Sequence, residues 1–394
     1  MAVKLGYKQT EVGVIPKEWT AKPLGELSEF ITSGSRGWAA FYSDQGALFI
    51  RSQNVRAGRL DFDDSQFVTP PQGAEGSRTR VKRNDLLITI TGNSVGNVAL
   101  VEYEFDEAYI SQHVGLVRLS ETNLGRYVCL FLSPGSPGNS QIWASQSGQS
   151  KPGLTLRDLQ DFWVALPPTE AEQCSIVAAL SDMDALLGSL EQLIDKKRDL
   201  KQATMEQLIT GQTRLPGFDG EWEVKRLGDV VQIKKGQLIT SSTLIPGDIP
   251  VIAGGKQPAY FHASANRFGR TVTISASGAS AGYVAFYDKP IFASDCSTIS
   301  ESESYSLDFV FYQLLSKQQV IYKAQTGGAQ PHIHAKDLNP ILFSFPPRPE
   351  QTAIAAVLTD MDAELAALEQ RLAKTRTLKQ GMMQELLTGK TRLL

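Results

Sequence analysis

The amino-acid sequence contains one long segment that occurs twice. Residues Ser181 to Leu215 return in closely similar form as Thr359 to Leu393. Both copies carry the strings DMDA, LEQ and LKQ at equal positions, and both close with LxTGxTRL. A repeat of this length means that each copy is one structural unit of the same type. The chain is therefore predicted to consist of two halves built on one plan.

The regions ahead of the two copies also correspond, although more loosely. Trp19 aligns with Trp222, Gly92 aligns with Gly278, and SGQSKPGLTLRDL before the first copy aligns with TGGAQPHIHAKDL before the second. Each half is thus predicted to be a globular domain followed by a long helix. The predicted segments are a first domain at 1–168, a central helix at 169–215, a second domain at 216–347 and a C-terminal helix at 348–394.

Both repeated segments show the apolar spacing of a coiled-coil helix. Their apolar residues recur in alternating steps of four and three, which marks a helix-pairing seam. The seam residues are Ile176, Leu180, Met183, Leu187, Leu190 and Ile194 in the first copy, and Ile354, Leu358, Met361, Leu365, Leu368 and Leu372 in the second. Each helix should follow a proline pair and end at Gly211 or Gly389, since glycine is the usual C-cap.

A single stripe of this kind would favour a helix packed on its own domain. Two matched seams in one chain instead favour pairing with each other. An antiparallel pair would relate the halves by an approximate two-fold axis, and we expect that arrangement. The globular parts are predicted to be α/β or α+β, because short apolar runs are separated by turn residues. Strands are expected at 48–50, 86–90, 98–101 and 114–119, and helices at 126–132 and 306–318.

Composition narrows the class of protein. The chain has 394 residues, of which 42% are hydrophobic and 21% charged, which is typical of globular domains. No apolar run is long enough to cross a bilayer and the N-terminus lacks a signal-peptide core, so we expect a cytoplasmic protein. The cysteines Cys129, Cys174 and Cys296 show no CxxC spacing and indicate neither a disulfide framework nor a zinc site. They are expected in the core or on a helix face.

The net charge of −3 argues against DNA binding by this chain alone, because such proteins usually carry a basic footprint. If it binds DNA, a partner should supply much of the phosphate neutralisation. Its loops nevertheless hold many side chains that can hydrogen-bond to base edges or phosphates. In the first domain the candidates are Ser33, Ser35, Arg36, Trp38, Arg51, Gln53, Asn54, Arg78, Arg80, Asn93, Ser94 and Lys151. In the second domain they are Lys235, Gln237, Lys256, Gln257, Ser277, Ser280, Gln330 and His332.

Catalytic and cofactor motifs do not emerge from the sequence. The glycine-bearing loops TGNSVG and ASGASAG match neither GxxxxGK[ST] nor GxGxxG. His332 and His334 lack further ligands at metal-site spacing, and no serine or cysteine triad stands out among four histidines. No catalytic residue, metal site or cofactor of its own is predicted for the chain.

The tandem layout, the two helices ending in LxTGxTRL and the stretch AAFYSDQGALFIRSQNV resemble the specificity subunit of type I restriction-modification systems. The resemblance covers nearly the whole chain. It implies a non-catalytic protein whose two target recognition domains each read one half of a bipartite DNA sequence, while the helices set the gap. It also implies two modification subunits that bring S-adenosylmethionine and methylate adenine, and restriction subunits that use ATP and Mg in prokaryotic defence.

The chain agrees with this resemblance in lacking the [DNS]PP[YF] motif of amino-methyltransferases, since Asn339-Pro340 is followed by Ile341. Two alternatives stay open at this level. One is a self-sufficient DNA methyltransferase or nuclease with unrecognised motifs, which S-adenosylmethionine binding by the isolated chain would support. The other is a coiled-coil scaffold without sequence-specific DNA reading.

Overall fold

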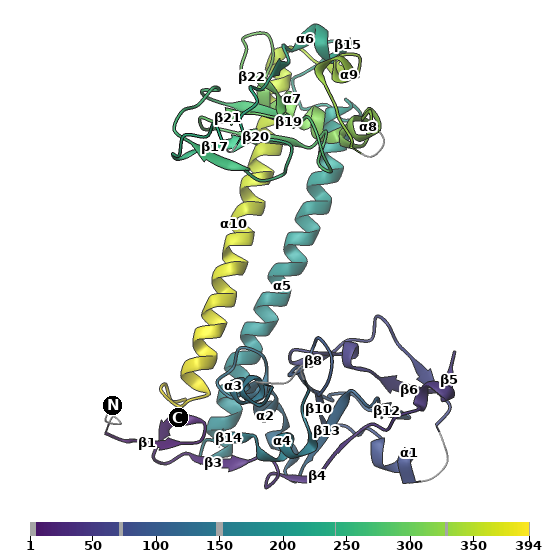
Figure 1. Cartoon of the computed structure of the whole chain (residues 1–394), viewed down its shortest axis with the longest axis vertical. Helices are drawn as coiled ribbons and strands as arrows, with labels where there is room; N and C mark the ends of the chain where they lie inside the picture. Colours follow the sequence, from purple (N-terminus) through teal and green to yellow (C-terminus); the bar gives the residue numbers. More distant parts are fainter. Residues whose placement is uncertain (1–4, 71–73, 147–152, 241, 328–329, 394) are drawn as a thin grey trace. The chain divides into compact units, whose positions relative to one another are not determined.

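The computed structural model describes residues 5–70, 74–146, 153–240, 242–327 and 330–393 (Figure 1). Contacts between residues divide the chain into two compact units. The first unit contains Met1–Ser189 together with Leu372–Leu394, and the second contains Leu190–Arg371. Each unit therefore combines one globular region with an end of each long helix. The long helices are α5 (Glu170–Ile209) and α10 (Arg348–Leu386).

The first unit is built around an antiparallel sheet of order β11–β10–β13–β4. Its strands are β4 (Ser28–Ser33), β10 (Leu86–Thr89), β11 (Val98–Leu100) and β13 (Val114–Leu119). A second sheet has the order β12–β6–β9–β5, in which β12 and β6 run parallel. Its strands are β5 (Tyr42–Ser43), β6 (Ala47–Ile50), β9 (Phe67–Val68) and β12 (Ala108–Ile110). The strands predicted at 48–50, 86–90, 98–101 and 114–119 are confirmed.

Smaller strand pairs and short helices complete the first unit. The pairs are β1 (Tyr7–Thr10) with β2 (Gly13–Pro16), β3 (Thr20–Pro23) with β14 (Trp163–Leu166), and β7 (Val55–Arg56) with β8 (Arg59–Leu60). The helices are α1 (Ala74–Thr79), α2 (Gly125–Leu132), α3 (Asn139–Ser145) and α4 (Leu156–Asp161), with 3-10 turns at Trp38–Phe41, Ser52–Asn54 and Thr122–Leu124. Helix α2 lies almost wholly in the core because its sequence is apolar on most sides, and the buried Tyr127 hydroxyl donates to Ala165 O at 2.9 Å.

The second unit repeats this plan. Its main sheet has the order β16–β22–β19–β20, and a smaller sheet has the order β18–β17–β21 with β17 and β21 parallel. The strands are β15 (Glu223–Arg226), β16 (Lys234–Lys235), β17 (Ile249–Ile252), β18 (Tyr260–His262), β19 (Thr271–Ser275), β20 (Val284–Tyr287), β21 (Phe292–Ala293), β22 (Cys296–Ser300) and β23 (Leu342–Phe345). The helices are α6 (Leu227–Val230), α7 (Leu307–Ser316), α8 (Gln318–Lys323) and α9 (Ala335–Leu338).

The match between the units follows from the sequence correspondence. Strand β10 sits between β11 and β13 as β19 sits between β20 and β22, and β3 pairs with β14 as β15 pairs with β23. The predicted helices at 126–132 and 306–318 are confirmed as α2 and α7. Mixed helices and strands in both globular parts make the fold α+β.

Both long helices begin and end as the sequence predicts. Helix α5 follows Pro167–Pro168 closely, and α10 starts directly after Pro346–Pro347. Gly211 and Gly389 follow the helix ends with φ values of +72° and +67°, a left-handed conformation that glycine adopts without strain. A larger residue would also crowd Gly389, because a Cβ there would stand 2.6 Å from Pro16 and 3.0 Å from Trp19. Over the described part of the chain, no helix is both long and apolar enough to span a membrane.

Candidate nucleic-acid interface

In the first unit, several polar loops meet at one end of the two sheets. The Ser111 amide donates to Ile50 O at 2.9 Å, which joins the loop after β12 to the loop after β6. The Ile90 amide donates to His113 O at 2.9 Å, which joins that same loop to the end of β10. Gly34 completes the junction, since a Cβ at this position would lie 2.3 Å from Ile110 O. The loops after β4, β6, β10 and β12 therefore form one surface, which we call the first reading end.

The first reading end contains a hollow of about 200 Å³. Four of the predicted residues line it, namely Ser35, Trp38, Arg51 and Gln53, together with others that include Tyr42, Gln112 and His113. Both ring nitrogens of His113 form hydrogen bonds: Nδ1 bonds to the Thr91 hydroxyl, and Nε2 lies 3.1 Å from Gln112 Nε2. Gln112 and His113 were missed from the sequence. Their position directly after the apolar run of β12 is the signal that could have found them.

Several predicted residues in this unit have partners inside the protein. The Arg78 guanidinium donates to Ser33 O at 2.8 Å and to Ser35 Oγ at 2.6 Å, so it holds the loop after β4 in place. The buried Asn54 side-chain amide donates to Asp61 O at 2.9 Å and to Asp64 O at 3.0 Å. These bonds to the backbone hold the segment around Asp61 and Asp64 in place. Trp38 is also buried, stacked on Phe49 with ring centroids 5.4 Å apart.

Arg51 combines a partner with a spare donor. Its guanidinium pairs with Asp64 at 3.1 Å, while its Nε is buried without a hydrogen-bond partner among the described residues. Gln53 bonds to the same Asp64 carboxylate. Arg36 and Asn93 are exposed, and Ser94 lies on the same loop as Asn93 with its hydroxyl 3.5 Å from Ser52 O. Lys151 lies outside the described residues.

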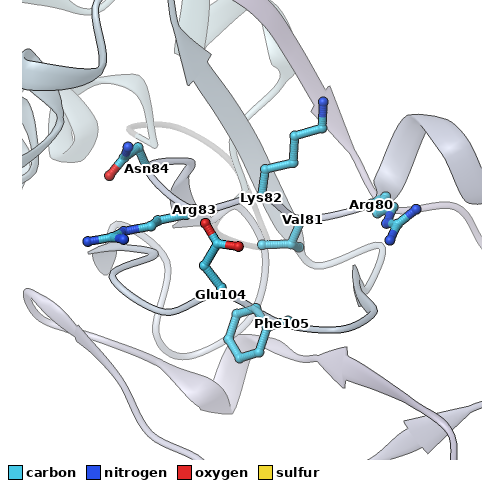
Figure 2. Close-up of a pocket in the computed structure, with 7 residues that line it drawn as sticks. All are labelled: Arg80, Val81, Lys82, Arg83, Asn84, Glu104 and Phe105. Carbon is cyan, nitrogen blue, oxygen red and sulfur yellow. The ribbon is translucent and has the colours of Figure 1, made fainter.

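Arg80 is separated from the reading end. It belongs to the loop that precedes β10, whereas Thr91 and Asn93 follow that strand. This loop lines a hollow of about 590 Å³ with Arg80, Lys82 and Arg83, shown in Figure 2 beside Glu104 and Phe105. We call the segment of residues 80–83 the basic loop.

A buried ion pair holds the basic loop. Arg118 Nη2 lies 2.7 Å from Asp85 Oδ2, and the Lys82 amide donates to the same oxygen at 2.7 Å. The Asp85 residue is fully buried, and this burial raises the pKa of its carboxyl despite the favourable Arg118 charge. Removal of Arg118 would leave the Asp85 carboxyl in the core without its cation.

The second unit brings its candidates together in the same way. The Gln237 amide donates to Ala293 O at 2.9 Å, the Gly278 amide donates to Pro331 O at 3.0 Å, and Ser277 forms a β-bridge with His332. The loops after β16, β17, β19 and β21 and the segment before α9 thus meet, and we call this surface the second reading end. Lys235, Gln237, Lys256, Gln257 and Gln330 are exposed on these segments, and Ser280 is half-buried.

Two side chains of the second reading end, Lys256 and Ser277, have partners inside the protein. The Lys256 ammonium lies 5.5 Å from the centre of the Tyr283 ring, a distance at which a cation–π interaction is favourable. Asp295 accepts a hydrogen bond from the Ser277 hydroxyl and was missed from the sequence.

The predicted seam residues of the helices fall into two groups. Ile176 and Leu180 lie in the core of the first unit with Met383, Leu386 and Leu387 of α10 and its tail. Ile354 and Leu358 lie in the core of the second unit with Met205, Leu208 and Ile209 of α5, and Met361 packs against that core. These positions therefore serve their own globular core and a helix contact at once. Among the remaining seam residues, Leu190 and Ile194 are buried, while Met183, Leu187, Leu365, Leu368 and Leu372 are half-buried.

Matched ion pairs join the two helices within each unit. In the first unit Arg392 Nη2 donates to Glu172 Oε2 at 2.8 Å, and Lys379 pairs with Asp184 at 2.5 Å. The residue numbers rise in one helix while they fall in the other, so these segments run antiparallel. Hydrogen bonding to Glu172 raises the pKa of Arg392 above its ordinary value, which favours the charged guanidinium.

The second unit repeats both pairs with the equivalent residues. Arg214 Nη2 donates to Glu350 Oε2 at 2.7 Å, and Lys201 pairs with Asp362. Arg214 lies 5.6 Å from the Trp222 ring, as Arg392 lies 5.8 Å from the Trp19 ring. The arginine just before the last leucine of each LxTGxTRL motif thus fastens the end of its helix, and we call these contacts the arginine clamps. In the part of the chain that the structure describes, no cluster of three or more histidine, cysteine or acidic side chains could hold a metal ion.

Comparison with known proteins places these features in one family. The model of the type I restriction modification DNA specificity domain matches residues 16–197 and 219–375. A putative type I restriction enzyme MjaX specificity subunit from Methanocaldococcus jannaschii is 23% identical, across 98% of this chain and 97% of its own length. The type I restriction enzyme EcoBI specificity subunit of Escherichia coli is 25% identical, across 50% of this chain and 43% of its own length.

Solved structures share the fold. The S subunit of a type I restriction-modification system from M. genitalium has a TM-score of 0.63 and 17% identity, with 98% of both chains covered. A chain from a type I system studied for its complex assembly and conformational transition has a TM-score of 0.60 and 19% identity, with 96% of this chain and 99% of the other covered. Because the family model matches most of the sequence, and the MjaX relative aligns with it over 97% of its own length, this chain belongs to the family of type I restriction-modification DNA specificity subunits.

Proposed function

We propose that each globular domain reads one half of a bipartite DNA target through its reading end. The observation that carries this proposal is that in each unit polar loops converge at one end of the sheets, with arginine or lysine, glutamine, serine and histidine side chains on them. These side chains supply the donors and acceptors used in direct readout of base edges. The basic loop, with Arg80, Lys82 and Arg83, is suited to phosphate contacts, which position the protein without specifying sequence.

The two helices are proposed to pair as an antiparallel coiled coil that relates the halves by an approximate two-fold axis. Support comes from the equivalent arginine clamps and from the equivalent pairs of Lys379 with Asp184 and Lys201 with Asp362. In this proposal, residues 1–168 and 216–347 form the domains that read DNA. Residues 169–215 and 348–394 form the helical spacer that sets the gap between the half-sites.

The chain is proposed to act without a catalytic site of its own. Two modification subunits that carry S-adenosylmethionine would dock on the helices and methylate adenine, and restriction subunits would add ATP- and Mg-dependent cleavage in the cytoplasm. The net charge of −3 supports such a division, because partner subunits then provide much of the positive surface that DNA requires. Adenine methylation in a duplex needs the base to be flipped out, so the recognition subunit must hold the site in register for the partner.

Reconstitution with the modification subunit tests this function. The purified chain alone should show no methyl transfer, and the assembled complex should methylate adenine within one bipartite sequence in a sequenced methylome. Methyl transfer by the isolated chain would contradict the assignment. Sequence-independent DNA binding by the complex would instead favour a scaffold.

Exchange of one domain tests the division between half-sites. Replacement of residues 216–347 by the second domain of a relative should change one half of the methylated sequence and leave the other half and the gap intact. The matched control replaces 1–168 and should change the opposite half. If both halves changed in either exchange, one domain would not read one half.

A further inference from the structure

One position is equivalent in the two reading ends but differs in charge. In the first unit Thr89 pairs with Val114, and the residue before Val114 is His113. In the second unit Ser275 pairs with Cys296, and the residue before Cys296 is Asp295. The strand registers therefore align His113 with Asp295.

Backbone and side-chain bonds support this equivalence. The Ile90 amide donates to His113 O at 2.9 Å, and the Ala276 amide donates to Asp295 O at 3.1 Å. Each side chain then bonds to a hydroxyl at the tip of the neighbouring strand, which is Thr91 for His113 and Ser277 for Asp295. The same framework therefore presents an imidazole at one reading end and a carboxylate at the other.

The surroundings of Asp295 differ from those of a structural carboxylate in this fold. Asp85 is fully buried, pairs with Arg118 and accepts a backbone amide of its own loop. Asp295 is only half-buried, and among the described residues no ion pair or hydrogen bond reaches its Oδ1. Because Ser277 occupies Oδ2, Oδ1 remains an acceptor at the surface where we place the DNA.

We propose that Asp295 is a specificity-determining residue of the second domain and that it selects cytosine through the exocyclic amino group in the major groove. This inference rests on the proposed function of the second reading end. An ionised carboxylate only accepts hydrogen bonds, and cytosine offers its N4 amino group as a donor. Guanine O6 and N7 and thymine O4 are acceptors, so they repel the carboxylate. Adenine presents N6 beside the acceptor N7, which suits the amide of asparagine or glutamine better.

The decisive experiment is Asp295→Asn in the complex with the modification subunit, followed by methylome sequencing. Asparagine has nearly the same shape and can keep the bond to Ser277, but it offers a donor beside its acceptor. At one G·C pair of the second half-site, we expect the preference for cytosine to fall at least about tenfold and adenine to be accepted, as expected for the loss of one good base contact. The first half-site and the gap should stay unchanged.

Two controls separate this effect from the loss of a charge or of the fold. Asp288→Asn removes an exposed carboxylate beyond β20, at the opposite end of the sheet from Ser277, and should leave the methylated sequence unchanged. His113→Asn changes the equivalent residue and should alter only the first half-site. An unchanged second half-site with Asp295→Asn, or a wild-type second half-site without any G·C pair, overturns the inference.

A second substitution, Asp295→Glu, tests the role of Asp295 if Asp295→Asn destabilises the protein. If Asp295→Asn lowers the melting temperature of the complex, Asp295→Glu provides the answer because it retains the carboxylate. It should methylate the original sequence at a reduced rate, and a changed sequence would overturn the inference. Lys235→Ala and Lys256→Ala test the second reading end separately from Asp295. If they weaken methylation of all sites while Asp295→Asn changes nothing, only the role of Asp295 fails. If they also change nothing, the second reading end itself fails.

Discussion

The arginine clamp of the first unit allows a quantitative test of what holds the end of α10 in place. We consider Arg392→Ala. The guanidinium of Arg392 bonds to the Glu172 carboxylate, and its side chain is 24% exposed while that of Glu172 is 1% exposed. The substitution therefore leaves a buried carboxylate without its cation. It also removes the contact with the Trp19 ring at 5.8 Å.

The expected decrease in the free energy of unfolding follows from the burial of Glu172. Breaking a buried pair by removing one partner costs about 3–5 kcal/mol, and the partial exposure of Arg392 places this case near about 3 kcal/mol. For a unit of roughly 200 residues, each kcal/mol lowers the melting temperature by about 2–4 °C, so a decrease of roughly 6–12 °C is expected. Calorimetry of the intact chain would measure the shift. Hydrogen exchange of the segment 372–393 would show whether the end of α10 opens first.

Matched variants make the result interpretable. Arg157→Ala removes an exposed pair with Asp161, whose side chains are 78% and 56% exposed, and should cost under about 0.5 kcal/mol. Glu172→Gln combined with Arg392→Ala should recover part of the loss, because a neutral amide replaces the unpaired charge. Arg214→Ala should reproduce the effect in the second unit, where Glu350 is equally buried. If Arg392→Ala were no more destabilising than Arg157→Ala, the clamp would not stabilise the unit.

Two further predictions follow from the packing. A truncation ending at Leu215 retains Met205, Leu208, Ile209 and Arg214, which are equivalent in the repeat to Met383, Leu386, Leu387 and Arg392. In a dimer these residues can take the places of their equivalents in the first unit of the other copy, so the truncated chain should dimerise. With the modification subunit, the dimer should methylate a palindromic site. Analytical ultracentrifugation at micromolar concentration would test this, and a folded monomer would contradict it. In the native chain a thiol reagent should label Cys174 alone, because burial raises the pKa of Cys129 to about 11 and of Cys296 to about 12, and rapid labelling of all three before denaturation would contradict the burial.

The sequence predicts which loops form the two reading ends, but it does not predict which single residues of those loops face the surface. The glycine-bearing loops and the string RSQN mark polar segments between apolar strands, and these segments do meet. The chemistry of Asn54 and Trp38 predicts DNA contacts, yet the fold buries both side chains. The sequence alone does not indicate that His113 and Asp295 are equivalent, because their equivalence depends on strand register. The pairings of Val114 with Thr89 and of Cys296 with Ser275 join segments that are distant in sequence.

The sequence by itself determined the tandem plan, the two long helices with their proline starts and glycine ends, the main strands and the family. These features follow from local periodicity and from an internal repeat, which need no knowledge of long-range contacts. Only the tertiary structure decided that Ile176 and Leu180 share a core with Met383 and Leu387, and that the repeated arginines fasten helix ends through Glu172 and Glu350. The physical reason is that burial and ion pairing depend on which distant segments meet, and a side chain of given chemistry serves the core, a clamp or a reading end according to those neighbours.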